Sequence, residues 1–473
     1  MYREDIGILE VVKSTILILV SILFQVLGNA PNVFGQSGSF YSFGQESINE
    51  QGTWLEFKSD GSLLCYGNSY SSGNWDLTIQ KLGLDGELIS AYEFGSASDD
   101  FAKRVIRNSD DLLFAGFRQA PGASESEAVV WQVDEMGNIL NEFAEFEPGV
   151  FLVYNTIDVC ADGGFVAAGY RKENTLNNPF ISRYDVSGSL VWKKEISTSA
   201  SDYLMGIEET PSGEFIAVGD RYIDSDSIYN IFFTKLSASG TVLWDTLMAF
   251  EANGGSRQLI STTDGNFLAC GEGSPAIGEP FDFYFIKISE SAEVLFRSWT
   301  GSEGGDACFD VLERYPNEFV ACGYGADRFG DSQLALAYIN EFGIADSFSY
   351  FGLSSIDIGQ GIAVSGSRIA VFGQSFELDN QYALVIETFG FAGLEPGNDK
   401  NWLITSNPAM RGGFLSTVDP SIYTISMLSL EGKLLELHKN ATGTFSIPND
   451  IATGNYLLYT DIGRNRPIHL LIK

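Results

Sequence analysis

A short apolar segment that ends in glycine recurs seven times along this 473-residue chain. It reads SLLCYG at 62–67, GFVAAG at 164–169 and EFVACG at 318–323. The closing glycines are Gly67, Gly116, Gly169, Gly219, Gly271, Gly323 and Gly373, so neighbouring copies lie 49 to 53 residues apart. A period of this length suits a blade of four short strands, and such blades close into a ring. The chain is therefore expected to be all-β and to form a seven-bladed β-propeller.

Each copy also contains a turn between two strands, such as LGLDGEL at 82–88. A left-handed position in such a turn prefers glycine, because glycine has no Cβ. Six copies have glycine there and the fifth has alanine, so the turn at Ala292 is expected to be altered or slightly strained. The seven turn positions are Gly86, Gly137, Gly188, Gly240, Ala292, Gly343 and Gly390.

Ten residues before each turn position stands a side chain with an oxygen acceptor. These residues are Asp76, Glu127, Asn178, Asn230, Asp282, Gln333 and Asn380. Each comes just before an apolar strand, where its oxygen can accept backbone N–H bonds and hold the incoming loop. Metal binding is the alternative, but repetition in all seven copies favours the structural role.

The seventh copy lacks its fourth strand, and a matching segment stands at the other end of the repeats. SFYSFG at 39–44 is similar to SAYEFG at 90–95, the fourth strand of the first copy. Residues 39–44 are therefore expected to close the last blade, which leaves no open sheet edge. The propeller is expected to span residues 36–394. Trp192, Trp244 and Phe296, which share one place in the fourth strands, are expected to be core between blades.

The N-terminal 35 residues have the pattern of a signal peptide. Lys13 precedes the uncharged segment STILILVSILFQVLGNA, and cleavage after Ala30 or Gly35 would fit. The alternative is an uncleaved membrane anchor, although polar residues make the apolar core short for a span. No other stretch has the composition of a membrane span, so the mature chain is expected to have none.

After a linker at 395–401, residues 402–473 differ from the repeats in charge and pattern. Their formal charge is +1, whereas the whole chain carries −34. Alternating segments such as SIYTISMLSLEGKLLELHK predict a small β-sandwich. The strongly acidic remainder disfavours binding to nucleic acid or to an anionic membrane.

Both parts resemble known families. The repeats resemble bacterial extracellular propellers of the delta-60-repeat or kelch-like kind. The C-terminal segment resembles the sorting domain of the type IX secretion system, through Asn407, Pro408, Gly432, Gly454, Tyr456, Leu457 and Lys473. This resemblance implies export by that machinery and a place in the medium or on the outer surface of a Gram-negative bacterium. An ordinary accessory domain is the alternative.

The residue inventory narrows the possible chemistry. The two histidines, His438 and His469, both lie in the C-terminal segment, so the propeller has no Ser–His–Asp triad and no histidine metal site. No cofactor is expected. Calcium is a weak alternative at the segment DSDS, 224–227, which lacks the glycine and the distal glutamate of a calcium loop. The five cysteines are an odd number and are expected to be mainly buried free thiols.

One asymmetry breaks the repeat two residues after the closing glycine. Three consecutive copies carry Arg118, Arg171 and Arg221 there, whereas the others carry serine or glycine. These arginines either form one face that binds an anionic or hydroxyl-rich ligand or pair with nearby acids. Without a predicted catalytic residue, the chain is expected to be a monomeric binding module for a glycan or a protein. A carboxylate-dependent glycan hydrolase or lyase is the alternative.

Overall fold

The computed structural model of this chain describes residues 38–388 with short gaps, and six further strands between residues 414 and 472. The gaps are 45–47, 197–200, 224–227, 249–252, 303, 327–331, 353–355, 367 and 377–380. Every regular element in the described residues is a β-strand, and no helix there is long and apolar enough to cross a membrane. The expected signal peptide, 1–35, and the linker, 395–401, lie outside the described residues.

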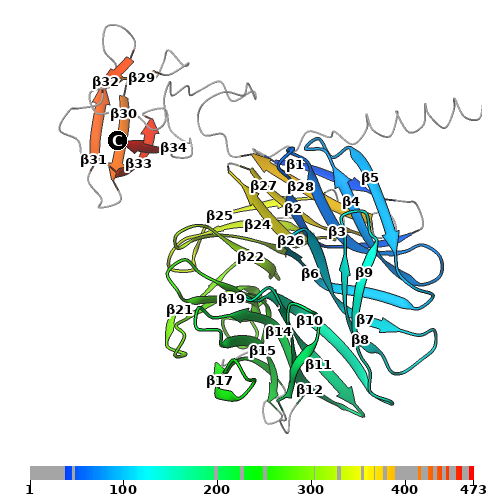
Figure 1. Cartoon of the computed structure of the whole chain (residues 1–473). Coiled ribbons are helices and arrows are strands. Elements are labelled where there is room, and N and C mark those ends of the chain that lie inside the picture. The colour runs from blue at the N-terminus through cyan, green and yellow to red at the C-terminus, as the bar shows by residue number, and fades with distance from the viewer. Residues whose placement is uncertain are drawn as a thin grey trace, which may run out of the picture. The chain divides into compact units, whose positions relative to one another are not determined.

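Seven antiparallel four-stranded sheets form the blades of the propeller, which confirms the predicted fold (Figure 1). Blade 1 contains β2 (Asn49–Phe57), β3 (Leu63–Tyr70), β4 (Trp75–Leu82) and β5 (Leu88–Phe94). Blade 2 contains β6 (Asp99–Asn108), β7 (Asp111–Gln119), β8 (Glu127–Val133) and β9 (Ile139–Glu145). Blade 3 contains β10 (Phe151–Val159), β11 (Phe165–Glu173), β12 (Leu176–Tyr184) and β13 (Leu190–Glu195). Blade 4 contains β14 (Asp202–Glu209), β15 (Phe215–Ile223), β16 (Ile228–Leu236) and β17 (Val242–Met248).

The remaining three blades follow the same order. Blade 5 contains β18 (Gly254–Ser261), β19 (Phe267–Gly273), β20 (Asp282–Ile288) and β21 (Val294–Thr300). Blade 6 contains β22 (Ala307–Tyr315), β23 (Glu318–Ala326), β24 (Ser332–Ile339) and β25 (Ala345–Phe351). Blade 7 contains β26 (Asp357–Ser365), β27 (Arg368–Ser375), β28 (Gln381–Thr388) and, as its outer strand, β1 (Gly38–Phe43). The first strands of the seven blades contact one another in a closed ring around the central channel.

Blade 7 is built from both ends of the repeat region. Strand β1 runs antiparallel to β28, with Tyr41 opposite Leu384, and the two lie side by side as blue and yellow strands in Figure 1. The ring of Phe43 packs at 5.7 Å from Tyr382 and 6.2 Å from Phe372. The strand that the seventh copy lacks is thus supplied by residues 38–43, and the hydrogen-bonding edge of β28 is covered.

The closing glycines are required by a β-bulge in the first strand of each blade. The register of β6 against β7 shifts by one residue between Ala102 and Arg104, opposite Gly116. The same shift occurs in blades 1, 3, 4, 5 and 6. A Cβ on Gly116 would lie 1.9 Å from the carbonyl oxygen of Phe101, and at the other six glycines the corresponding distance is 1.8 to 2.4 Å. Only glycine fits where the bulged backbone comes this close.

The turn glycines have the left-handed conformation that the sequence predicts. Their φ angles are 77° to 79° at the five described glycines, and Ala292 is held at 66°. An aromatic ring of the preceding blade lies beside several of these turns: a Cβ on Gly240 would lie 2.8 Å from Trp192. Trp192, Trp244 and Phe296 pack against the apolar clusters between blades, which confirms their role as core.

The five cysteines are all free and buried, as expected. Cys270 and Cys308 share the apolar cluster between blades 5 and 6 with Phe283 and Phe319. Burial raises the pKa of the Cys308 thiol well above its usual value. These thiols therefore act as small apolar core groups.

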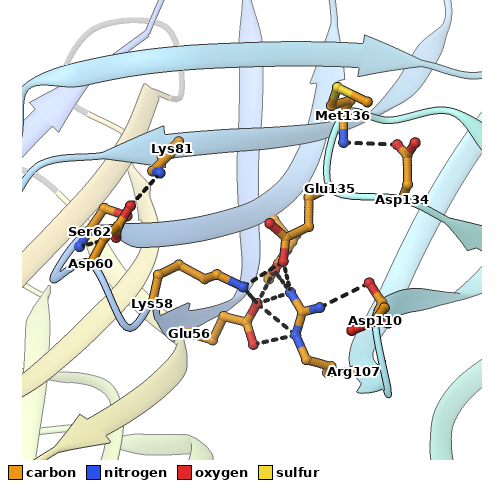
Figure 2. A network of polar contacts seen from close by, with 11 residues as sticks. Glu56, Lys58, Asp60, Ser62, Lys81, Arg107, Asp110, Asp134, Glu135 and Met136 are labelled. Carbon is orange, nitrogen blue, oxygen red and sulfur yellow. Dashed lines mark hydrogen bonds and ion pairs between the residues drawn. The ribbon is translucent and has the colours of Figure 1, made fainter.

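Ion pairs join neighbouring blades at the end of the ring where the first strands finish. Figure 2 shows Arg107 of blade 2 bound to Glu56 of blade 1, while Glu135 accepts bonds from Lys58 at 2.5 Å and from Arg107 at 2.8 Å. Burial opposes ionisation of Glu56, but the bonds from Arg107 and Tyr66 outweigh it and lower the pKa of that carboxyl.

A second type of pair recurs within the blades. A polar side chain near the end of the third strand binds an acid at the first turn, as Lys81 binds Asp60 at 2.7 Å (Figure 2). The equivalent pairs are Gln132–Asp111, Arg183–Asp162, Lys235–Glu214 and Lys287–Asp264, at 2.5 to 2.7 Å. The sequence analysis did not foresee these pairs.

The second compact unit contains the six remaining strands. These are β29 (Phe414–Ser416), β30 (Thr424–Ser429), β31 (Leu434–His438), β32 (Thr444–Ser446), β33 (Gly454–Thr460) and β34 (Ile468–Ile472). They form a sheet in the order β31-β30-β33-β34 and a pair β29-β32. Of the sorting-signal residues, Gly454, Tyr456 and Leu457 lie in β33, whereas Asn407, Pro408, Gly432 and Lys473 lie outside the described residues. The sandwich stays a prediction.

Candidate functional site: the central channel

The three arginines singled out by the sequence are each engaged within their own blade. Arg118 donates from Nε to Asp100 at 2.7 Å and from its two terminal nitrogens to Glu142 at 2.8 and 3.1 Å. Arg221 repeats this geometry, with Asp202 at 2.7 Å and Asp245 at 2.9 Å.

Arg171 is surrounded by three carboxylates of blade 3 and the loop that enters it. Glu147 lies at 3.0 Å, Glu173 at 3.2 Å and Glu195 at 3.7 Å from its guanidinium nitrogens. In blades 2 and 4 the arginine spans the sheet from the first strand to the fourth. These pairs match the alternative in which the three arginines form salt bridges with nearby acids.

Two of the loops between blades are held by an acceptor other than the expected one. In the two loops after blades 1 and 5, the acceptor of the loop N–H is an aspartate on the next first strand. Asp100 accepts from Ser96 N at 2.5 Å and Asp306 accepts from Ser302 N at 2.6 Å. Asp76, one of the expected acceptors, instead accepts from the side chain of Asn74 at 3.0 Å. Burial, with the nearby carboxylates of Glu93 and Asp100, raises the pKa of Asp76 to about 6.

The β-bulge leaves one extra residue in the first strand of each blade, at the same level of the ring around the channel. We call these residues the bulge ring: Thr53, Lys103, Asn155, Met205, Arg257, Phe309 and Gln360. The seven positions are structurally equivalent, yet they carry seven different residue types. The position that faces each of them across the bulge is glycine in all seven blades. The scaffold is therefore repeated, and the lining of the channel is not.

Lys103 is the exposed cation of the bulge ring. Its Nζ lies 4.8 Å from the ring centroid of Phe101 and 6.0 Å from that of Phe117. The pKa of Lys103 is lowered by the surrounding protein and by the like charge of Arg257 in blade 5. A lysine that reaches water but is enclosed by protein fits a position inside a channel.

Arg257 reaches the same level of the channel from blade 5. Its guanidinium binds Glu272 through Nε, at 3.0 Å, and through Nη2. It also lies over the ring of Phe309, at 5.4 Å from the centroid. Phe309 in turn packs at 6.0 Å from Tyr324.

Next to the bulge ring, an ion pair crosses the channel. Arg104 of blade 2 lies 3.3 Å from Asp310 of blade 6, although 206 residues separate them. Asp310 is fully buried, which raises the pKa of its carboxyl, and it also accepts from Ile362 N of blade 7 at 3.1 Å. Asp310 thus joins blades 2, 6 and 7 across the channel.

Two carboxyls lie further along the first strands. Asp158 accepts from Glu209 N at 2.9 Å and Val159 N at 2.8 Å. Glu208 occupies the equivalent place in the next blade. Burial raises the pKa of both groups, and the charge of Asp158 raises that of Glu208 further. Two neighbouring carboxyls with raised pKa values are suited to act as an acid–base pair.

Partly exposed aromatic rings continue from Lys103 over the neighbouring blades. Trp75 packs edge-on against Phe101 at 5.2 Å, Phe101 stacks on Phe117 at 5.7 Å, and Phe117 contacts Phe151 at 5.6 Å. At the blade 1 end, Tyr70 packs against Trp75 at 5.6 Å and is 40% exposed. We call this row, together with Lys103, Arg257 and Phe309, the channel mouth.

Among the described residues, no cluster of three or more histidine, cysteine, aspartate or glutamate side chains could hold a metal ion. The channel mouth was missed by the sequence analysis. Aligning the seven copies on their closing glycines would have exposed it, because the bulge-ring residue stands 13 or 14 positions before each glycine and never repeats.

No protein-family model and no curated protein matches the chain. Among solved structures, it is similar to the WD40 β-propeller domain of Doa1, with 14% identity over 73% of this chain and 97% of that one and a TM-score of 0.45. A puromycin hydrolase matches with 10% identity over 82% and 58% and a TM-score of 0.45. A Bacteroides caccae protein of unknown function matches with 15% identity over 63% and 97% and a TM-score of 0.40. We draw no functional argument from likenesses this remote.

Proposed function

We propose that this protein is a binding propeller that acts outside the cell and holds its ligand at the channel mouth. The observation that carries the proposal is the bulge ring, in which seven equivalent positions carry seven different side chains. A ring selected only for stability has no need of this asymmetry, whereas a ligand site needs a specific set of donors and apolar surfaces.

The route to the outside is the second part of the proposal. The signal-like start and the sorting-domain-like end suit export by type IX secretion machinery, followed by release or surface attachment. A chain truncated after residue 401 should then accumulate in the periplasm of a host with that machinery. Its normal appearance outside the cell would contradict this route.

Binding is tested with the chain lacking residues 1–35, applied to glycan and protein arrays. A ligand should be captured by the parent and lost by Phe101→Ala, a change at the channel mouth away from the apolar clusters between blades. Retained melting temperature would show that the fold is intact. Ligand capture that no substitution at the channel mouth weakens would contradict this site.

A glycan hydrolase or lyase is the second candidate, favoured by Asp158 and Glu208. Two neighbouring carboxyls with raised pKa can serve as acid and base in glycoside cleavage. Release of reducing ends from polysaccharides by the parent, abolished in Glu208→Gln, would favour this candidate. Binding without turnover would favour the first.

A further inference from the structure

We infer that the ligand of the channel mouth is an acidic saccharide whose anionic group binds Lys103 and whose sugar ring lies against Phe101 and Phe117. This inference rests on the proposed binding function and names the ligand class. Uronic acids and sulfated sugars share the required chemistry, which is an anion on a ring with an apolar C–H face.

The first argument is the lack of a carboxylate partner for Lys103 among the described residues. In a chain of net charge −34, most described cations have a carboxylate partner. Lys103 has none among the described residues, and its contacts are two aromatic rings. An anion from outside would supply the missing partner.

The second argument is the like charge across the channel. Lys103 and Arg257 come from blades 2 and 5, and the positive charge of Arg257 helps to lower the pKa of Lys103. Glu272 takes up Nε and Nη2 of Arg257, which leaves Nη1 for another acceptor. One anion between the two cations would relieve their repulsion and gain a bond from each.

The third argument is the aromatic row beside Lys103. Phe101 and Phe117 are stacked with an interplanar angle of 20°, and both are partly exposed. Flat apolar surface next to an ammonium group matches the apolar face of a sugar with a charged substituent. A free inorganic anion would use only the ammonium group of this arrangement.

The fourth argument concerns depth. The pair Arg104–Asp310 crosses the channel next to the bulge ring, so a polysaccharide cannot thread past it. The mouth therefore accommodates a chain end or a short oligosaccharide. At equal numbers of chain ends, short and long chains should bind with similar affinity.

The test uses calorimetry on the chain lacking residues 1–35 with a tetragalacturonate, its methyl ester and a sulfated disaccharide of the chondroitin type. The ester keeps the ring and removes the charge. We expect binding of at least one acidic probe and at least a tenfold loss for the ester if the uronate is the ligand. Lys103→Ala should weaken binding at least tenfold, Lys103→Arg should retain most of it, and Phe101→Ala should abolish it.

Lys172→Ala is the matched control, because Lys172 is also exposed but lies outside the channel mouth. It should change affinity less than twofold, and all variants should keep the parental melting temperature. Equal affinity for acid and ester, both lost in Phe101→Ala, would overturn the acidic class and leave the proposed binding function standing. An affinity for acidic probes that Lys103→Ala leaves unchanged would overturn the inference. Absence of any ligand on saccharide and protein arrays would count against the proposed function as well.

Discussion

At the scale of single residues, each blade contains one position that cannot vary beside one that does. The closing glycine faces a carbonyl oxygen too close for any side chain. The bulge residue opposite it belongs to the strand beside the channel, and the fold places little restriction on its type. Steric necessity therefore fixes the closing glycine, whereas the bulge position is free to vary with function.

Gly219→Ala tests the steric half of this account. Its Cβ would lie 1.9 Å from the carbonyl oxygen of Tyr203, so the strands must separate, and we expect a loss of about 3 kcal/mol in the free energy of unfolding. Gly305→Ala is the control, since that glycine has open space and an ordinary φ. Denaturant unfolding measures both; equal stability of the two variants would contradict the bulge explanation.

Ala292→Gly should have the opposite effect. The left-handed φ of 66° costs alanine about 1–2 kcal/mol, of which glycine recovers a part after its larger entropy loss on folding. We expect a gain of about 1 kcal/mol by denaturant unfolding. A destabilised variant would mean that the methyl group makes a packing contribution larger than the strain.

At the scale of elements, the closing strand joins the two ends of the repeat region in one sheet. Strand β1 covers β28 and brings Phe43 onto Phe372 and Tyr382. Within blades 2 and 4, Arg118 and Arg221 join first and fourth strands in the same way. The sheets of blades 2 and 4 are thus held by side-chain pairs as well as by their hydrogen-bond ladders.

Deleting residues 36–43 should expose the edge of β28. We expect a fall in melting temperature on the order of 10 °C and association through the unpaired edge. A synthetic peptide of residues 37–44, added in trans, should restore both properties. A monomeric deletion variant as stable as the parent, by scanning calorimetry and light scattering, would contradict the role of β1.

At the scale of the whole molecule, the surroundings of each carboxyl determine whether its pKa is lowered or raised. Paired carboxyls such as Asp264 have a pKa lowered to about 2, where burial is outweighed by bonds from Lys287 and Thr262. Burial raises the pKa of Asp220 and of Asp282 to about 6. At a pH near 5, these buried carboxyls therefore keep protons in the folded propeller that they have lost in the unfolded chain.

This difference predicts how stability depends on pH. A carboxyl whose pKa is higher in the folded state loses folding stability as pH rises from its unfolded value near 4 to its folded value. Groups with a lowered pKa are already ionised by then. The melting temperature should fall as pH rises from about 4.5 to 6, and Asp220→Asn should make this fall shallower. A melting temperature that rises over this interval would contradict the assignment.

The repeat, read alone, determined the number of blades, the left-handed turns, the aromatic core between blades and the state of the cysteines. Each of these follows from local steric or apolar constraints that recur every 49 to 53 residues, so the period itself reveals them. The partners of Arg118, Arg171 and Arg221 did not follow, because several acids lie near each of them in sequence. Only the tertiary structure decided which side chains share the channel: Arg104 meets Asp310, and the charge of Arg257 acts on Lys103, because closing the ring brings distant blades to one axis. No local pattern encodes a contact that depends on the curvature of seven packed sheets.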